Sequence, residues 1–206
     1  NLNKDVHQFI FPLKYDKYVG KTPKSVNGVN ILKNNKKFID QTLLDWVFIA
    51  ELMGLSNGDG LFHKKYLSLI FNKKQRDVLL FVVDGMQKLG LNTAIKPHSL
   101  SSACETVSFY SVHLIEVLKE NGVYWNKGKD KKTPQFVLQG SKEIICAYIR
   151  GLFESDGCVA LNKGKSGRVK FGNCSFNICE ELQHLLYIIG IHSTISSYKK
   201  EGSQEM

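Results

Sequence analysis

Residues 52–60 read LMGLSNGDG, and residues 149–157 read IRGLFESDG. Both stretches carry Gly-Leu at their third and fourth positions and end in Asp-Gly, with Asp156 placed 97 residues after Asp59 (156 − 59). A helix that runs through the apolar letters and stops at the last glycine leaves each aspartate beside a carboxyl end that is already partly negative. The sequence therefore predicts two carboxylates in unfavourable places, and their presence needs an explanation.

The similarity continues downstream of both stretches and indicates an internal duplication. A run with helical apolar spacing follows each stretch and ends at a glycine between two aliphatic residues, Gly90 in the first copy and Gly190 in the second. These glycines are 100 residues apart (190 − 90), whereas the motif aspartates are 97 apart. The second copy is therefore longer by about three residues over roughly thirty positions. We therefore expect one duplicated unit, with the extra residues in a loop.

Each copy is predicted to begin with the helix that contains its motif and to continue into strands. Ser141 is suited to the N-cap of the second motif helix. The first copy has a further strand and helix that have no counterpart in the second copy. The expected helices cover residues 41–55, 72–90, 112–122, 141–152 and 177–190, and the expected strands lie within 61–71, 105–111 and 158–173.

Composition indicates a folded globular protein with a polyanionic partner. Of the 206 residues, 43% are hydrophobic, and 28 Lys and Arg against 19 Asp and Glu give a formal charge of +9. This balance favours nucleic acid over acidic small molecules. In the hairpin at 158–173, basic and apolar residues alternate, so we expect the basic side chains on one face and the apolar ones turned inward. The residues expected to contact nucleic acid are Lys64, Lys65, Lys163, Lys165, Arg168 and Lys170.

The five cysteines are odd in number and form no Cys-x-x-Cys pair with a matching histidine group, which indicates reduced thiols and an intracellular protein. Zinc bound by Cys174, Cys179 and His184 is an alternative, but the spacing favours packing of Cys179 within a helix. Charged residues interrupt every long apolar stretch, and the N-terminal residues lack the apolar core of a signal sequence. We therefore expect no membrane segment.

Two lysine-rich segments flank the first copy. Residues 1–35 have little periodicity and are expected to form an irregular arm, and residues 122–135 form a connector in which Pro134 excludes an ordinary helix. Such charge runs are often only solvated loops, and composition by itself favours that interpretation. The expected domains are the arm at 1–35, the first half with its connector at 36–138, and the second half at 139–206.

Each motif helix also has a face of small residues. Gly54 and Gly58 are four apart, as are Gly151 and Ser155, so the backbones of two such helices can approach closely. Packing them would bring the motif aspartates together, and a shared divalent cation would offset the repulsion between the carboxylates. Oxygen ligands suit Mg²⁺, or Mn²⁺ in its place, and the reaction class implied is metal-assisted phosphodiester hydrolysis. Either motif taken alone is consistent with an ordinary helix end.

The two nonapeptides resemble those of monomeric LAGLIDADG homing endonucleases, most closely the dodecapeptide type found in inteins. The run KKTPQFVLQGSKEIICAYIRGLFESDG resembles the Lys-x-x-Pro segment that precedes the second motif in that group. The resemblance implies an α+β fold of two pseudo-symmetric αββαββα halves that meet at two helices. Their antiparallel sheets would form a saddle over double-stranded DNA, on a monomer with internal pseudo-twofold symmetry.

The resemblance also implies roles for individual residues. The protein would cut DNA across the minor groove of a long recognition site, leaving short 3′ overhangs, wherever in the cell that DNA resides. The alternative is a relative that binds nucleic acid without cutting, such as an intron RNA maturase or a transcription regulator. The implied metal ligands are the carboxylates of Asp59 and Asp156 with the backbone carbonyls of Gly58 and Ser155. The implied basic residue that polarises water or phosphate in one half is Lys131, with Lys132 as a substitute.

Two departures from the family pattern bear on these roles. The sixth motif position, often Asp in the family, is Asn57 in one copy and Glu154 in the other. The second copy also lacks the strand and helix near which its own catalytic lysine would be expected, so no residue is assigned to that role. The chain runs from Asn1 to Met206 without the terminal residues of a splicing intein, which leaves intein, intron and free-standing origins open.

Overall fold

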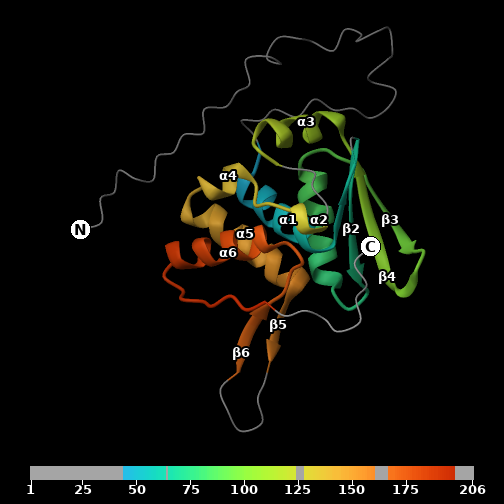
Figure 1. Cartoon of the computed structure of the whole chain (residues 1–206). Coiled ribbons are helices and arrows are strands. Elements are labelled where there is room, and N and C mark those ends of the chain that lie inside the picture. The colour runs from blue at the N-terminus through green and yellow to red at the C-terminus, as the bar shows by residue number, and fades with distance from the viewer. Residues whose placement is uncertain (1–43, 64, 124–127, 161–166, 198–206) are drawn as a thin grey trace.

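Two helices that carry the sequence motifs lie at the centre of the fold. Helices α1 (Trp46–Asp59) and α5 (Lys142–Asp156) pack side by side in the middle of the molecule (Figure 1). Every residue of α1 from position 48 to 57 is buried, as expected for a helix that protein encloses on all sides. The predicted pairing of the motif helices is confirmed. The computed structural model describes residues 44–63, 65–123, 128–160 and 167–197.

Glycine at one position of each motif lets the two helix backbones touch. A Cβ atom on Gly54 would overlap the carbonyl oxygen of Tyr148 on α5, and a Cβ atom on Gly151 would overlap the carbonyl oxygen of Glu51 on α1. Because the obstacles are backbone atoms, no rotamer change can relieve either overlap. The two glycines therefore determine how closely α1 and α5 approach each other. They thereby also determine how far apart the last residues of the two helices lie.

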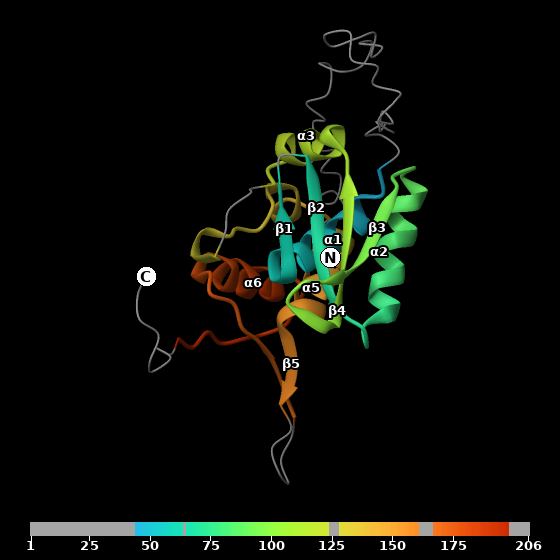
Figure 2. The same ribbon diagram turned by 90° about the vertical axis from the view of Figure 1, so that its right-hand side faces the viewer.

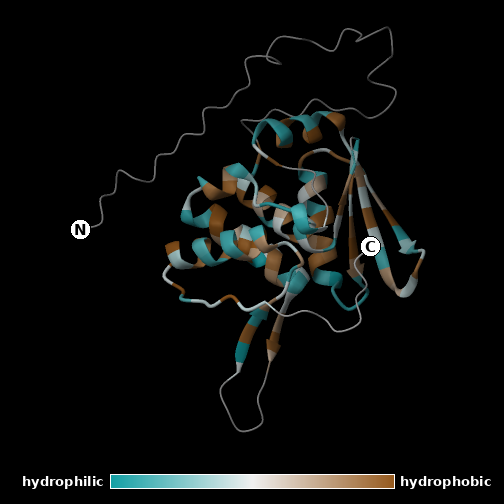
Figure 3. Cartoon of the chain, in the orientation of Figure 1, coloured by the Kyte–Doolittle hydropathy of each residue, from teal (hydrophilic) through white to brown (hydrophobic). Residues whose placement is uncertain are grey.

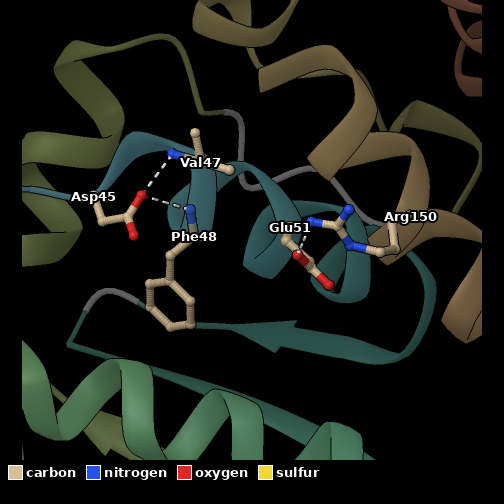
Figure 4. A network of polar contacts seen from close by, with 5 residues as sticks. All are labelled: Asp45, Val47, Phe48, Glu51 and Arg150. Atoms are coloured by element: carbon tan, nitrogen blue, oxygen red, sulfur yellow. Dashed lines mark hydrogen bonds and ion pairs between the residues drawn. The ribbon is translucent and has the colours of Figure 1, made fainter. Parts of the chain in front are cut away.

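Polar contacts fix the start of α1 and tie its middle to α5. The Asp45 carboxylate accepts hydrogen bonds of 3.0 Å from the backbone N–H groups of Val47 and Phe48, so α1 begins at Trp46 rather than at the predicted residue 41 (Figure 4). One turn further on, Arg150 of α5 donates to the buried Glu51 carboxylate at 2.6 Å. This ion pair satisfies a carboxylate that the helix interface would otherwise leave buried and unpaired.

The first half adds an antiparallel four-stranded sheet in the order β1-β2-β4-β3. Leu67 lies opposite Phe109 on the buried face, whereas Ser68 and Ser108 lie opposite each other on the outer face, which Figure 2 turns toward the viewer with α1 and α5 behind. Figure 3 shows the resulting alternation of hydropathy along the strands. The elements are β1 (Gly60–Phe62), β2 (Tyr66–Asn72), α2 (Arg76–Lys88), β3 (Thr93–His98), β4 (Ser101–Tyr110) and α3 (Val112–Glu120).

The connector leads from α3 to α5 and contains two short helices. Pro134 is the N-cap of the second of them, so the predicted absence of an ordinary helix holds only up to this proline. Ser141 accepts from the backbone N–H of Ile144 at 3.4 Å and is the N-cap of α5, as predicted. The remaining elements are the 3-10 helix η4 (Gly128–Asp130), α4 (Gln135–Leu138), β5 (Gly157–Ala160), β6 (Arg168–Phe171) and α6 (Phe176–Ile188).

In the second half, β5 and β6 form a two-stranded hairpin that projects away from the helices (Figure 1). The register places Arg168 and Lys170 on one face and Val169 on the other, as the alternation predicted. The expectation that the apolar residues face inward is wrong for the outer part of the hairpin, since Val159 and Val169 are 66% and 69% exposed. Phe171, at the base of the hairpin, packs on Phe153 of the body of the protein.

The observed architecture is α+β, with a duplicated helix, hairpin and helix around the α1–α5 interface. Within the described residues the first half carries four strands and the second half two, which agrees with the missing strand and helix noted in the sequence. The expected arm at residues 1–35 lies outside the described residues. The order of elements nevertheless repeats around the two motif helices, so the duplication read from the sequence is a structural one.

Candidate functional site

The two motif aspartates end their helices at the same place. Asp59 is the last residue of α1 and Asp156 the last of α5, and each helix is followed directly by a strand. The helices are in contact up to these ends: a Cβ atom on Gly58 would overlap the Ser155 side chain and lie 3.3 Å from the Asp156 Cγ atom. Packing through small residues therefore brings the two motif ends together, as the spacing predicted.

The pair of carboxylates is electrostatically unfavourable. The pKa of Asp59 is raised above its ordinary value because partial burial removes water from the carboxylate and because Asp156 lies nearby, while Lys131 lowers it. Both carboxylates also stand at carboxyl ends of helices, where the backbone adds partial negative charge. The site therefore concentrates negative charge that a cation would stabilise.

Lys131 reaches this site from the connector. Its ammonium Nζ donates to the carbonyl oxygen of Asn57 at 2.6 Å and to that of Gly58 at 3.0 Å, so it covers the last turn of α1 next to Asp59. A cation in this position satisfies carbonyls that have no helical partner and opposes the negative end of the helix dipole. Lys132, the substitute suggested by the sequence, is exposed, and its backbone carbonyl accepts from the Asn57 amide at 3.3 Å.

Asp156 has a different neighbour. The Asn173 amide, which follows β6, donates to its carboxylate oxygen Oδ2 at 2.8 Å. Ser155, one residue earlier, donates its hydroxyl back to the helix carbonyls of Gly151 and Leu152 at 3.2 and 3.0 Å. No sequence signal indicated Asn173, because 17 residues and a hairpin separate it from Asp156.

The candidate nucleic-acid contacts divide into two groups. Lys65 is exposed at the turn between β1 and β2, and Arg168 and Lys170 are exposed on β6. These three side chains are on strands or turns that adjoin the two motif ends, because β1 and β5 each begin at the glycine after a motif aspartate. The other three predicted contacts, Lys64, Lys163 and Lys165, lie outside the described residues.

The oxygen atoms that lie at the ends of the two motifs are suitable ligands for a hard divalent cation. They belong to two carboxylates and to backbone carbonyls, and the pKa of Asp59 stays raised because burial and Asp156 outweigh the charge of Lys131. No cluster of three or more His, Cys, Asp or Glu side chains occurs in the described part of the chain. Mg²⁺ and Mn²⁺ fit such a set, because water and substrate phosphate complete their coordination. The zinc alternative through Cys174, Cys179 and His184 has no such cluster behind it.

Comparison with known proteins bears on the fold. Residues 143–206 match the family described as LAGLIDADG-like domain. The crystal structure of I-DmoI in complex with DNA and Mn is similar over 73% of this chain and 82% of that chain, with a TM-score of 0.50 and 16% sequence identity. This chain has the LAGLIDADG fold. The predicted resemblance to this family is thereby confirmed, and the family match includes the second nonapeptide at residues 149–157.

This chain also matches segments of larger proteins. The alpha subunit NrdEB of ribonucleoside-diphosphate reductase from Bacillus subtilis is 28% identical over 172 residues, which are 77% of this chain and 16% of the reductase subunit. A DNA polymerase from Thermococcus litoralis is 23% identical over 181 residues, 86% of this chain and 10% of the polymerase. The chain thus spans less than a fifth of either relative. Among the described helices, none combines the length and apolarity needed to cross a bilayer.

Proposed function

We propose that this LAGLIDADG chain is a site-specific endonuclease that cleaves both strands of DNA at a long recognition site. The observation that carries the proposal is the convergence of Asp59, Asp156 and Lys131 at the ends of two helices in contact. Two carboxylates that repel each other, with a lysine ammonium beside one of them, make a poor structural element and a suitable site for phosphodiester hydrolysis. The proposal is supported further by the fold, which I-DmoI shares.

In this mechanism Asp59 and Asp156 hold a divalent cation, Mg²⁺ or Mn²⁺, together with the backbone carbonyls of Gly58 and Ser155. When bound, the cation supplies Lewis-acid stabilisation of the phosphate and lowers the pKa of water. Lys131 has a separate task, because an ammonium at this end of α1 can donate to a phosphate oxygen or to water. Asn173 keeps the Asp156 carboxylate in one orientation.

The surfaces beside the site would hold the duplex. The outer face of the four-stranded sheet carries partly exposed hydroxyl side chains such as Thr106 and Ser108, and the hairpin adds the exposed cations Arg168 and Lys170. Hydroxyl and guanidinium groups can read base edges, whereas lysine ammonium groups fix the phosphate backbone. A net charge of +9 supports attraction to DNA at long range.

The proposal is tested by incubating the protein with a library of long duplexes and Mg²⁺, followed by sequencing of the cut ends. We expect paired cuts a few nucleotides apart at one family of related sites, and loss of cutting of at least one strand in Asp156→Asn with DNA binding retained. Specific binding without cutting, with Mg²⁺ or Mn²⁺, would instead support a maturase or regulator that has lost the reaction. Equal cutting by Asp156→Asn and wild type would contradict the assigned site.

We propose, in addition, that the chain is an element carried inside a host protein, as in an intein. The supporting observation is that similar segments make up only 16% and 10% of a reductase and a polymerase, whose names describe different reactions. A module shared by unrelated enzymes serves its own function rather than theirs. Sequencing of the flanking gene tests this idea: an open frame that encodes host protein on both sides is expected, and stop codons immediately outside would contradict it.

A further inference from the structure

A polar cluster, buried except for one partly exposed member, surrounds the backbone of the connector just after η4. Its members are Thr133, Tyr148, Ser175 and Glu181, which we call the connector clamp. The exposed fractions of Thr133, Tyr148 and Ser175 are 1%, 0% and 0%. Polar groups this deep in a protein destabilise it unless they are hydrogen-bonded, so their partners show what they hold. None of the four belongs to a LAGLIDADG motif position that the mechanism uses.

The clamp binds the connector from the side of α6. Ser175, the N-cap of α6, donates its hydroxyl to the carbonyl oxygen of Lys131 at 2.7 Å. Glu181, one and a half turns along α6, accepts from the backbone N–H of Thr133 at 2.7 Å. Two consecutive turns of α6 therefore bind the backbone at Lys131 and at Thr133, on either side of Lys132. Residues 131–134 belong to no helix or strand, so they have no regular backbone hydrogen bonds of their own.

The clamp binds the same segment from the side of the motif helices. The Tyr148 hydroxyl of α5 accepts from the Asn57 amide at 2.7 Å and donates to the Thr133 hydroxyl at 3.3 Å. Asn57 also donates to the carbonyl oxygen of Lys132 at 3.3 Å. Complete burial raises the pKa of Tyr148, so its hydroxyl keeps the proton that the bond to Thr133 requires.

We propose that the connector clamp is a positioning device that holds the Lys131 ammonium at the carboxyl end of α1. The proposal deepens the endonuclease function proposed above and rests on it for its effect on catalysis. Lysine has a long side chain with about 2 kcal/mol of rotamer entropy, so a fixed ammonium requires a fixed backbone on both sides. The backbone carbonyl of Asn57 accepts a hydrogen bond from the Lys131 ammonium, and its side-chain amide donates one to the Tyr148 hydroxyl. Asn57 therefore connects the clamp directly to the site.

The clamp also links the two halves of the molecule. Ser175 and Glu181 belong to α6 of the second half, whereas the carbonyls that receive Lys131 belong to α1 of the first. A displacement of α6 would therefore move Lys131 relative to Asp59. The second half, by this route, controls a group that acts at the motif of the first half, in addition to supplying its own aspartate.

The first test measures the position of Lys131 without any enzymatic reaction. The metal-free, DNA-free protein is labelled with a trace of acetic anhydride, and mass spectrometry gives the acylation rate of Lys131 relative to the exposed Lys74. Tyr148→Phe removes one hydroxyl from the clamp and keeps the ring. We expect it to raise the relative rate at Lys131 by about twofold to tenfold, the range for loss of one hydrogen bond. Tyr187→Phe, on an exposed part of α6, should leave the rate unchanged.

A second pair of variants tests the same hydrogen bond independently, in case Tyr148→Phe does not fold. Thr133→Val removes the other hydroxyl at nearly constant volume, and Thr133→Ser restores it. We expect Thr133→Val to raise the acylation rate of Lys131 and Thr133→Ser to return it to the wild-type value. An unchanged rate in both Tyr148→Phe and Thr133→Val, with thermal unfolding showing folded protein, would overturn the clamp, whatever the protein does to DNA.

The third test connects the clamp to cleavage by a double-mutant cycle. In single-turnover reactions with saturating Mg²⁺, Tyr148→Phe should lower the cleavage rate about twofold to tenfold in the wild-type background and not at all in Lys131→Met. Equal losses in both backgrounds would show that Tyr148 acts independently of Lys131 and would contradict the proposal. If no variant or wild type cleaves DNA, the endonuclease function fails, and the acylation rates still decide the positioning role.

Discussion

The Lys131 ammonium donates to the carbonyl oxygens of Asn57 and Gly58, 2.6 and 3.0 Å away, so a residue of the connector caps the first motif helix from 73 positions further along the chain. This contact accounts for part of the unfavourable placement of Asp59. The ammonium opposes the helix dipole and lowers the pKa of Asp59, although burial and Asp156 outweigh it and leave that pKa raised. The remaining negative charge is available to a metal ion.

Replacement of Lys131 should separate catalysis from binding. Lys131→Met keeps much of the side-chain length and removes the charge, so we expect single-turnover cleavage of one strand to fall about 10²- to 10⁴-fold, the range for a general acid or base. Affinity for the same DNA, measured by fluorescence anisotropy in Ca²⁺, should change little. Lys129→Met, in η4 of the same connector, is the charge-matched control. If cleavage were lost in Lys132→Met and retained in Lys131→Met, the assignment of Lys131 to the site would be contradicted.

Removal of the Asp59 charge should stabilise the metal-free protein. A carboxyl group whose folded pKa exceeds its unfolded value of 3.8 destabilises the native state once it is ionised, so the penalty is present above the folded pKa and absent below 3.8. We expect Asp59→Asn to raise Tm at pH 7 by about 1–2 °C, a small gain because water still screens the partly exposed carboxylate. The gain should shrink as the pH falls toward 4. Glu154→Gln, an exposed acid of the second motif, should show no such pH-dependent gain.

Divalent cations should reverse that order of stability. A ligand that binds only the folded state raises Tm in proportion to the logarithm of its concentration above Kd. In a titration with Mn²⁺ followed by thermal unfolding, wild type should therefore gain stability while Asp59→Asn and Asp156→Asn gain little. An identical rise in Tm for all three proteins would mean that the cation binds elsewhere.

The close approach of α1 and α5 should not tolerate a methyl group. Gly54→Ala places its Cβ atom against the carbonyl oxygen of Tyr148, so α1 must move away from α5. We expect a loss of about 1–3 kcal/mol in the free energy of unfolding, from urea denaturation. Gly172→Ala provides a matched control, because no atom lies within 4 Å of the Cβ position there. Comparable losses in both variants would point to glycine content in general rather than to the helix contact.

The hairpin should contact DNA through its basic face. If Arg168 contacts a base, Arg168→Ala costs about 1–3 kcal/mol of binding free energy at one position of the DNA site. If it contacts a phosphate, the substitution weakens binding to every sequence and lowers by about one the slope of log binding constant against log salt concentration. We expect the base contact, with discrimination relaxed at one base pair in a binding assay over several salt concentrations. Lys88→Ala, on α2 behind the sheet, removes the same charge and should leave discrimination intact. Wild-type discrimination in Arg168→Ala at every salt concentration would exclude this face.

Local features of the chain could be read from the sequence. The terminal Asp-Gly of each motif predicted the ends of α1 and α5 at Asp59 and Asp156, four residues beyond the apolar runs at 41–55 and 141–152. The alternation along β6 follows from the two-residue period of a strand. These properties depend on neighbours within a few positions, which is why the sequence determines them. Duplication of the pattern then predicted the pairing of the two helices and the meeting of their aspartates.

Contacts between distant segments were decided by the tertiary structure. The donors and acceptors that join Lys131 to Gly58, Asn173 to Asp156 and Arg150 to Glu51 have no fixed spacing, and each depends on how packed elements are oriented. The exposure of Val169 has the same origin: strand alternation determines which face a side chain occupies, but only the surrounding fold determines whether anything covers that face. Sequence thus determined the helix ends and the acids on them, while packing decided which groups surround each acid.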